Sequence, residues 1–394
     1  MRRFSVFIMV MLAASAYVAA GQSMAVTVAN PTFSDRKAQT IELPLKEVSS
    51  RLGSACYYVT SANGTEIPSQ VTYDSLLVFK ADVPAAGKTR FTVATDSRRH
   101  TYPDVCCGRV YPQRADDVAW ENNLVGFRAY GPATQRRGEK AFGYDLFFIY
   151  PGEEPVVESL YEAQCSPRNW AVVDSLRKID RQQAKEFENS FTYHIDHGKG
   201  MDCYAVGPTL GAGVAAPVFG DSIGFAWCYD KAEILDNGPV RFTVRLTFAP
   251  RTVASSDNVV ETRIISLDRD SYLNRCSVTF NGLTQPVMLG CGFPLRDSSP
   301  AIMMSSPGII AYADPTQGSD NGKALLGIIH PHGFSQTRKA SGHVLGMSPL
   351  NPGDTFTYYW GFAWNRTGVP DLSTWTGNLL STNDNIKNPL IITF

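Results

Sequence analysis

Along most of the chain, hydrophobic residues alternate with polar ones or gather in short apolar runs, which is the pattern of β-strands. In the N-terminal part these runs occupy residues 25–28, 40–45, 57–60, 76–80 and 89–94. Turn signals such as Asn63-Gly64 separate them. The pattern predicts a small immunoglobulin-like sandwich over residues 24–97.

The region from residue 100 to the C-terminus continues this pattern over a greater length. Its expected strands include residues 222–229, 240–249, 259–267, 277–280, 287–290, 308–313, 325–330, 355–364 and 390–394. Tight turns such as Asn281-Gly282 favour antiparallel pairing, and the strand–helix alternation of a parallel sheet does not occur. We therefore predict an all-β chain whose second domain, 100–394, is one large two-sheet sandwich. The one sizeable stretch of helical composition is 164–190.

The N-terminus has the pattern of a secretory signal over residues 1–20. Arg2 and Arg3 precede an apolar run at 4–16, and the small residues at 18–20 follow it. The run is short for a membrane span and no second one follows, so we expect no membrane insertion. The pattern predicts a periplasmic or secreted protein.

The net charge and the cysteines limit the classes of function that the sequence allows. The 36 basic and 37 acidic residues give a net charge of −1, which argues against a nucleic-acid partner or an anionic membrane surface. The eight cysteines permit disulfides in an oxidising compartment without giving their connectivity. No Cys-x-x-Cys pair, Gly-x-Ser-x-Gly motif or phosphate-binding loop is present in the sequence.

The segment 193–204 combines histidines, aspartates and a lysine with two glycines, and no hydrophobic period runs through it. Such a composition favours a site over a core element, although a polar loop with turn-capping aspartates is the structural alternative. His194, Asp196 and His197 are metal-ligand types. A mixed His/Asp site would suit zinc, manganese or calcium, but adjacent residues of a strand point to opposite faces, so Asp196 and His197 face one ion only if the backbone loops there. We expect no cofactor, and a metal at this segment stays an open alternative.

Four motifs resemble those of a known family: DVAWEN at 117–122, GFRAYGP at 126–132, DHGKGMD at 196–202 and GPTLGAG at 207–213. The family consists of exported proteins of polysaccharide-degrading bacteria, long described as a domain of unknown function. The resemblance implies a galactose-mutarotase-like β-supersandwich. Through similarity to an ulvan oligosaccharide dehydratase it also implies removal of water from a uronic acid at the non-reducing end. It assigns no residue roles.

Residue roles follow instead from the chemistry of β-elimination across C4–C5 of a uronate. The reaction needs a cation for the carboxylate, a base at C5–H and an acid at the leaving hydroxyl. The candidate catalytic residues are His197 as base, Tyr130 and Tyr204 as acids, and Lys199 as a stabilising charge. We expect Asp196 or Asp202 to orient His197.

The candidate substrate-binding residues are Arg128 as carboxylate clamp, Trp120 and Trp364 as sugar-stacking walls, and Glu121, Asp202 and His332. Each has an ordinary alternative, such as a surface arginine, a turn histidine or a core tryptophan. We expect Trp120, Arg128, Tyr130, His197, Lys199 and His332 to converge on one cleft on the concave face of the large domain.

The sequence thus predicts a dehydratase or lyase whose partner is a uronate-containing oligosaccharide. Two alternatives stay open. One is a glycoside hydrolase with paired carboxylates such as Glu121 and Asp202. The other is a non-catalytic glycan-binding protein. The oligomeric state does not follow from the sequence.

Overall fold

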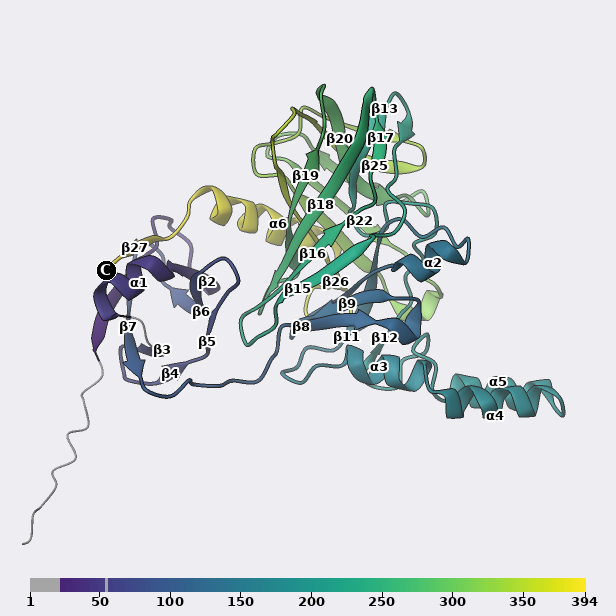
Figure 1. Cartoon of the computed structure of the whole chain (residues 1–394), viewed down its shortest axis with the longest axis horizontal. Coiled ribbons are helices and arrows are strands. Elements are labelled where there is room, and N and C mark those ends of the chain that lie inside the picture. Colours follow the sequence, from purple (N-terminus) through teal and green to yellow (C-terminus); the bar gives the residue numbers. More distant parts are fainter. Residues whose placement is uncertain (1–21, 54–55) are drawn as a thin grey trace, which may run out of the picture.

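The computed structural model describes residues 22–53 and 56–394. The expected signal segment, 1–20, lies outside the described residues. The chain forms a small and a large β-rich body, which an extended linker between strands β7 and β8 connects (Figure 1).

The small body is a sandwich of two antiparallel sheets, with strand orders β27-β1-β7-β3-β4 and β2-β6-β5. Its elements are β1 (Ser23–Ala29), β2 (Arg36–Pro44), α1 (Leu45–Leu52), β3 (Cys56–Ser61), β4 (Glu66–Ile67), β5 (Ser69–Val71), β6 (Leu76–Val83), β7 (Lys88–Asp96) and β27 (Ile391–Thr393). Alternate residues such as Val26, Val28 and Val93 fill the space between the sheets. The predicted small sandwich is present.

One strand lies elsewhere than expected. The sequence pattern placed residues 390–394 in the large domain, but β27 pairs with β1 at the edge of the small sheet. Helix α6 (Leu372–Lys387) leads the chain back to the small body (Figure 1). A three-residue apolar strand fits many sheet edges, so its sequence carries no information on its partner.

The large body contains three antiparallel sheets, of strand orders β12-β11-β10-β9-β8, β14-β13-β20-β25-β24 and β15-β16-β18-β19-β26-β23-β22-β21, with β17 beside β18. The first half of its elements are β8 (Cys107–Tyr111), β9 (Asp117–Glu121), β10 (Gly126–Ala129), α2 (Pro132–Arg136), β11 (Tyr144–Ile149), α3 (Val157–Gln164), α4 (Pro167–Arg177), α5 (Arg181–Asn189), β12 (Gly200–Met201), β13 (Ala215–Phe219), β14 (Ser222–Ile223), β15 (Lys231–Asp236) and β16 (Arg241–Thr247). They are followed by β17 (Arg251–Val253), β18 (Ser256–Asp268), β19 (Leu273–Asn281), β20 (Val287–Pro294), β21 (Ile302–Met304), β22 (Ile309–Asp314), β23 (Ala324–Ile329), β24 (Gln336–Ala340), β25 (His343–Leu350) and β26 (Phe356–Trp364). This architecture confirms the predicted all-β class with antiparallel sheets, consistent with a supersandwich.

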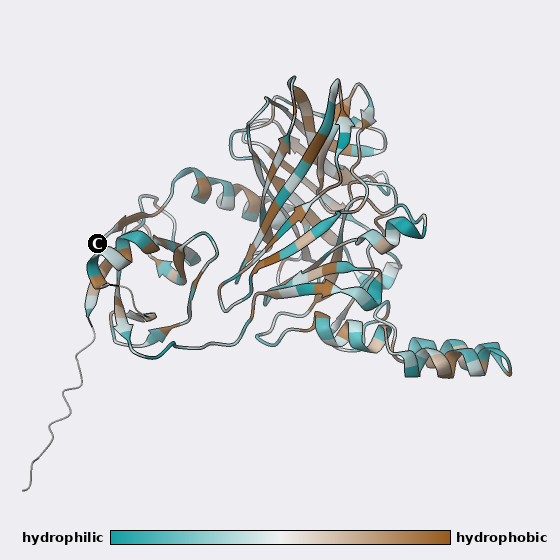
Figure 2. Cartoon of the chain, in the orientation of Figure 1, coloured by the Kyte–Doolittle hydropathy of each residue, from teal (hydrophilic) through white to brown (hydrophobic). Residues whose placement is uncertain are grey.

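The core of the large body lies between its sheets and is rich in aromatic side chains. Trp360 stacks on Tyr144, with ring centroids 4.1 Å apart, and meets Phe127 edge-on at 5.0 Å. Figure 2 shows hydrophobic and hydrophilic residues alternating along the long strands. Because successive side chains point to opposite faces, Phe127 faces the core while its neighbour Arg128 faces outward. The polar residues of β9, β10 and β11 therefore share one outer face.

The predicted helical stretch, 164–190, corresponds to α4 and α5, which follow directly on α3. Helix α3 lies against the outer face of the sheet containing β9 and β11. Its residues Val157, Leu160 and Tyr161 pack in one hydrophobic cluster with Phe147 of that sheet. Helices α4 and α5 form a hairpin that projects from the body (Figure 1). No helix in residues 22–53 and 56–394 combines the length and apolar character of a membrane span. All eight cysteines are unpaired in the described chain.

Candidate functional site

A cluster of charged and phenolic side chains occupies the outer face of strands β9–β11, beneath the segment that follows α5. The Arg128 cluster, as we name it, consists of Arg114, Asp117, Arg128, Tyr130, Asp145, Tyr193 and Asp202. Strand alternation places Asp117, Arg128 and Asp145 on this face, because the intervening residues face the core. Asp202 joins them because β12 pairs with β11.

Arg128 is the centre of this cluster and is only 3% exposed. Its Nε donates to Asp145 at 3.0 Å, its Nη2 to Asp202 at 2.8 Å, and its Nη1 to the Tyr193 hydroxyl at 3.2 Å. Oxygen atoms of the protein itself thus accept the hydrogen bonds that the guanidinium donates. The prediction that Arg128 grips a substrate carboxylate is wrong for this reason, and the residue instead holds two aspartates in place.

Burial makes two acids of this cluster, Asp117 and Asp202, reluctant to ionise. Burial and the neighbouring Asp145 raise the pKa of Asp202, although Arg128 opposes them. Burial likewise raises the pKa of Asp117 to about 6. Within the described chain, Asp117 Oδ2 and the hydroxyl of Tyr161 on α3 are buried without a hydrogen-bond partner.

His194 connects this buried cluster to solvent. Its side chain is 55% exposed, and its Nδ1 lies 3.9 Å from Asp202 Oδ2 and 3.0 Å from the backbone oxygen of the same residue. The backbone N–H of Asp202 donates to the Tyr193 carbonyl at 2.8 Å, which holds the two segments side by side. The imidazole thus has one nitrogen toward a buried aspartate and one edge toward solvent.

His197 lies in the turn beyond this contact, and its surroundings differ from the expectation. Its Nε2 is 3.1 Å from the Thr192 carbonyl oxygen. Asp196 accepts hydrogen bonds from the N–H groups of Gly198 and Gly200 and from the Tyr150 hydroxyl at 2.7 Å. Asp196 is therefore a turn-capping residue, and neither it nor Asp202 orients His197. The expectation of an aspartate–His197 pair is wrong.

The sequence pattern could not show that His194, and not His197, lies beside an aspartate. His194 and Asp202 become neighbours only through the pairing of β12 with β11, a contact that depends on tertiary structure. The spacing of eight residues between them matched no motif. Lys199, also exposed, reaches α3 instead, where its Nζ lies 3.3 Å from Ser159 Oγ.

The two tryptophans expected to stack on a sugar are core residues. Trp120 is 0% exposed and its Nε1 donates to Asn274 Oδ1 at 2.8 Å. Trp364 is 1% exposed and its Nε1 donates to the Asn321 carbonyl at 2.8 Å. Both tryptophans occupy inward-facing positions of their strands, and large apolar side chains usually fill such positions. The expectation of sugar-stacking walls at these positions is wrong.

Three further candidates also have structural surroundings. Both oxygens of Glu121 accept backbone N–H groups at the start of α3, each at 2.8 Å, so Glu121 caps this helix. Burial raises the pKa of Glu121 to about 7. Tyr204 is buried, with its hydroxyl unpartnered in the described chain. His332 is exposed beside His330, after β23, and has no contact with the Arg128 cluster among the described interactions.

Polar residues gather beside the turn that carries His194, where the Tyr150 hydroxyl donates to Asp196 and the charge of Arg366 acts on both. We define the His194 rim as His194, Asp196, Tyr150 and Arg366. Tyr150 is 38% exposed and its ring lies 5.2 Å from that of Trp364, over which Arg366 also lies at 5.4 Å. The rim thus combines an imidazole, a phenol and a guanidinium at the edge of the buried cluster. No group of three or more metal-ligating side chains was found in the part of the chain that the structure describes.

The chemistry available here is proton transfer to or from an exposed imidazole beside a buried aspartate. A neutral His194 can accept a proton from a molecule bound on its exposed side, and Asp202 lies close enough to stabilise the resulting imidazolium. Arg128 fixes that aspartate from behind.

The chain belongs to the family described as "Domain of unknown function (DUF4861)", with the match spanning residues 28–392. It is similar to "Uncharacterized protein P7" of Formosa agariphila, at 27% identity over 291 residues, which cover 72% of this chain and 69% of that protein. The resemblance noted in the sequence motifs is confirmed as far as this family of unknown function.

Among solved structures, the chain is similar to a protein in the glycosyl hydrolase family 38 from Enterococcus faecalis. The TM-score is 0.50 at 8% identity, over 94% of this chain and 47% of that one. An alpha-mannosidase from Enterococcus faecalis V583 matches with a TM-score of 0.45 at 9% identity, over 94% and 46% of the two chains. The chain spans about half the length of these structures, and the first likeness shows a shared fold.

Proposed function

We propose that this protein is a carbohydrate-active dehydratase or lyase that eliminates across C4–C5 of a uronic acid. The observation that carries the proposal is the exposed His194 imidazole, 3.9 Å from an aspartate that Arg128 holds at 2.8 Å. Elimination from a uronate needs a base of near-neutral pKa, which a histidine supplies. The His194–Asp202 pair suits proton abstraction better than hydrolysis, because its exposed group is a single imidazole and not two carboxyl groups that face a substrate.

In the proposed reaction, His194 takes the C5 proton. The electrons of the C5–H bond form the C4=C5 double bond, and the oxygen on C4 leaves with its bonding pair. Arg366, exposed on the His194 rim, stabilises the charge that spreads into the substrate carboxylate. The Tyr150 hydroxyl, on the same rim, protonates the leaving oxygen, so that water departs in a dehydration.

The substrate class comes from the motif resemblance, which implies ulvan-type oligosaccharides with a uronic acid at the non-reducing end. We propose that the protein works in the periplasm or outside the cell, in line with the signal pattern of residues 1–20. The similarity to glycosyl hydrolase folds supports a carbohydrate-related role without naming a bond or a sugar.

A glycoside hydrolase is the second candidate, and the surroundings of Glu121 weigh against it. Hydrolysis by retention or inversion needs two carboxyl groups that face the substrate. Both Glu121 oxygens are held by the N–H groups of Val156 and Val157, so Glu121 does not pair with Asp202 across a substrate. A glycan-binding protein without activity is the third candidate, and it requires no base.

The deciding experiment incubates the full chain with uronate-terminated oligosaccharides and follows the ultraviolet absorbance of the conjugated unsaturated uronate. We expect absorbance to rise, with loss of one water per chain end in the mass spectrum. New reducing ends without this absorbance indicate the hydrolase. Binding without either product indicates the glycan-binding protein.

A further inference from the structure

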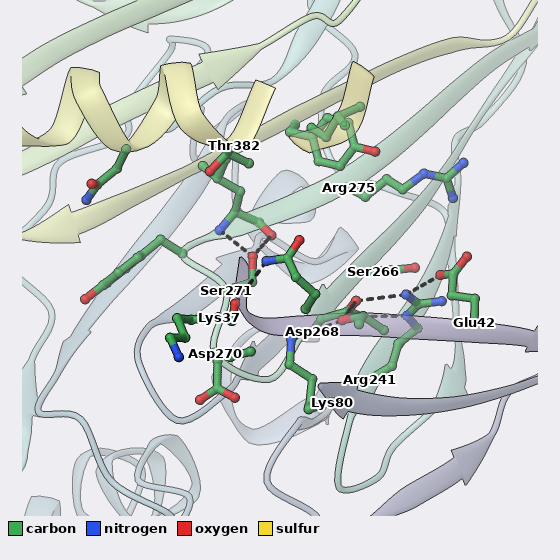
Figure 3. A pocket seen from close by; sticks show the side chains of 18 of the residues that line it. Lys37, Glu42, Lys80, Arg241, Ser266, Asp268, Asp270, Ser271, Arg275 and Thr382 are labelled. Atoms are coloured by element: carbon green, nitrogen blue, oxygen red, sulfur yellow. Dashed lines mark hydrogen bonds and ion pairs between the residues drawn. The ribbon is translucent and has the colours of Figure 1, made fainter. Parts of the chain in front are cut away.

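A hollow lies between the two bodies, away from the Arg128 cluster. It has a volume of about 670 Å³, within the range of small-molecule sites. Strands β2 and β6 of the small sandwich form one wall, strands β16, β18, β19 and β26 of the large sheet form the floor, and α6 forms the remaining side (Figure 3). We call it the interdomain pocket. None of its lining residues belongs to the Arg128 cluster or the His194 rim.

The register of the large sheet builds the floor of this pocket. Arg275 of β19 lies opposite Ser266 of β18 and Tyr359 of β26, so the three form a row across the sheet. Their neighbours Cys276 and Trp360 face the core. The row thus points outward, toward the small sandwich.

The carboxylates of the pocket already have partners. Asp268 accepts two hydrogen bonds from Arg241, at 2.6 and 2.8 Å, and one from Thr40 at 2.7 Å. Glu42 accepts from Arg241 at 2.6 Å. Asp270 accepts from the Asn123 amide at 2.7 Å. Asp268 and Glu42 are thus paired with Arg241, Asp270 also lies 3.8 Å from Arg269 Nε, and the fourth carboxylate, Asp74, accepts a hydrogen bond from the Thr72 hydroxyl.

Two cations of the pocket have no such partner. Lys80 donates to Thr40 Oγ1 at 3.1 Å, and no carboxylate of the described chain lies within ion-pair distance of it or of Arg275. Lys80 points into the hollow beside Asp268 in Figure 3. Burial lowers the pKa of this lysine, which a bound anion would oppose.

The rest of the lining suits a sugar ring. Tyr272 is half-buried and meets Trp375 of α6 edge-on, with ring centroids 5.7 Å apart. Tyrosine rings pack well on the apolar faces of sugars. Hydroxyl and amide groups from Ser271, Asn378 and Thr382 lie around it and can bond to sugar hydroxyls.

We infer that the interdomain pocket binds an acidic sugar residue, with its carboxylate or sulfate on Lys80 and Arg275 and its ring against Tyr272. The two unpaired cations select the acid, and the polar and aromatic lining selects the sugar. The inference rests on the proposed function only in naming a saccharide. Such a site would hold an oligosaccharide at a second point, apart from the reacting end.

The test measures binding to the full chain by isothermal titration calorimetry with glucuronate, glucose 6-sulfate and glucose. We expect at least one acidic sugar to bind more tightly than glucose. Lys80→Met and Arg275→Gln should each weaken that binding about tenfold or more, because each removes a hydrogen bond to a charged group. Lys339→Met, an exposed lysine of β24 outside the pocket, is the matched control and should bind as the wild type.

Preference for the sulfate or for the carboxylate identifies the acidic group, and either supports the inference. Equal binding of glucose, no binding of the acidic sugars, or wild-type binding by both Lys80→Met and Arg275→Gln overturns it. Arg275 is exposed, so its variant should fold even if the lysine variant does not. His194→Ala should bind in the interdomain pocket as the wild type does, whether or not it is inactive, which separates this test from that of the proposed function.

Discussion

At the scale of single residues, the charge network around Arg128 decides how the candidate site is held together. A buried ion pair contributes little net stability, but removing one partner leaves the other charged and unsolvated. Arg128 has two such partners, Asp145 and Asp202, each at most 3% exposed. The guanidinium is therefore needed for the fold of the site before any substrate arrives.

We expect Arg128→Met to lower the free energy of unfolding by about 3–5 kcal/mol, since it strands two buried aspartates. Arg136→Met is the matched control, because Arg136 pairs with Asp116 in an exposed bridge, and it should cost less than about 1 kcal/mol. Urea denaturation of both variants measures the difference. Similar midpoints for the two would contradict a central role for Arg128.

Asp314 gives a prediction on pH. Burial raises its pKa from 3.8 to about 6, and its Oδ2 has no hydrogen-bond partner in the described chain. The folded state therefore holds the proton more tightly than the unfolded state. The stability from this group is complete below the unfolded pKa and is lost as the pH rises through the folded pKa.

The free energy of unfolding of the wild type should accordingly fall between about pH 4 and about pH 6. Asp314→Asn cannot ionise and should show a shallower fall over the same window. Guanidinium denaturation at several pH values measures both curves. Parallel curves would show that Asp314 is not protonated in the folded protein.

At the scale of elements, the short strand β12 brings Asp202 to Arg128. Its first residue, Gly200, has a φ of +125°, and a Cβ there would lie 2.0 Å from the Phe148 carbonyl oxygen. Only glycine permits this approach of two backbones. The pairing of β12 with β11 therefore depends on one residue.

We expect Gly200→Ala to cost more stability than Gly198→Ala and to reduce turnover as well, because it displaces Asp202. Gly198 also has a positive φ, of +89°, but its Cβ would meet nothing within 4 Å, so the control carries only backbone strain of about 1–3 kcal/mol. Thermal unfolding and turnover of both variants test this. Equal losses in the two would remove the role given to the close approach.

The elements also show which features of the structure can be predicted from the sequence and which cannot. Alternation correctly predicted most strands, because it records which side chains meet the core. It does not record what covers the other face, so Arg128 looked like a ligand-binding residue. Trp120 was predicted to stack on a sugar, whereas strand alternation turns its ring into the core and the charged Asp117 and Glu121 to the outer face. His194 was missed because its partner, Asp202, lies beside it only through the pairing of β12 with β11.

At the scale of the whole molecule, Arg241 joins the two bodies. Its guanidinium contacts Glu42 of the small sandwich and Asp268 of the large sheet, each at 2.6 Å. Strand β27 adds a covalent return of the chain to the small sheet. Interfaces between domains are commonly polar, so a few such contacts govern their coupling.

We expect Arg241→Met to cost between about 1 and 4 kcal/mol, since its pairs are partly buried, and to split calorimetric unfolding into two transitions. Arg245→Met changes an arginine of the same strand whose one ion-pair partner among residues 22–53 and 56–394 is Glu233, and it should keep a wild-type profile. A single, unshifted transition in Arg241→Met would show that other contacts couple the two bodies.

In the proposed reaction, His194, held near Asp202, is the base of the elimination. The most direct measurement compares kcat/KM of His194→Ala and His197→Ala for formation of the unsaturated uronate. We predict a loss of about 10²–10⁴-fold for His194→Ala, the usual contribution of a positioned acid–base group, and near wild-type turnover for His197→Ala. Full activity in His194→Ala, or loss confined to His197→Ala, would contradict the account.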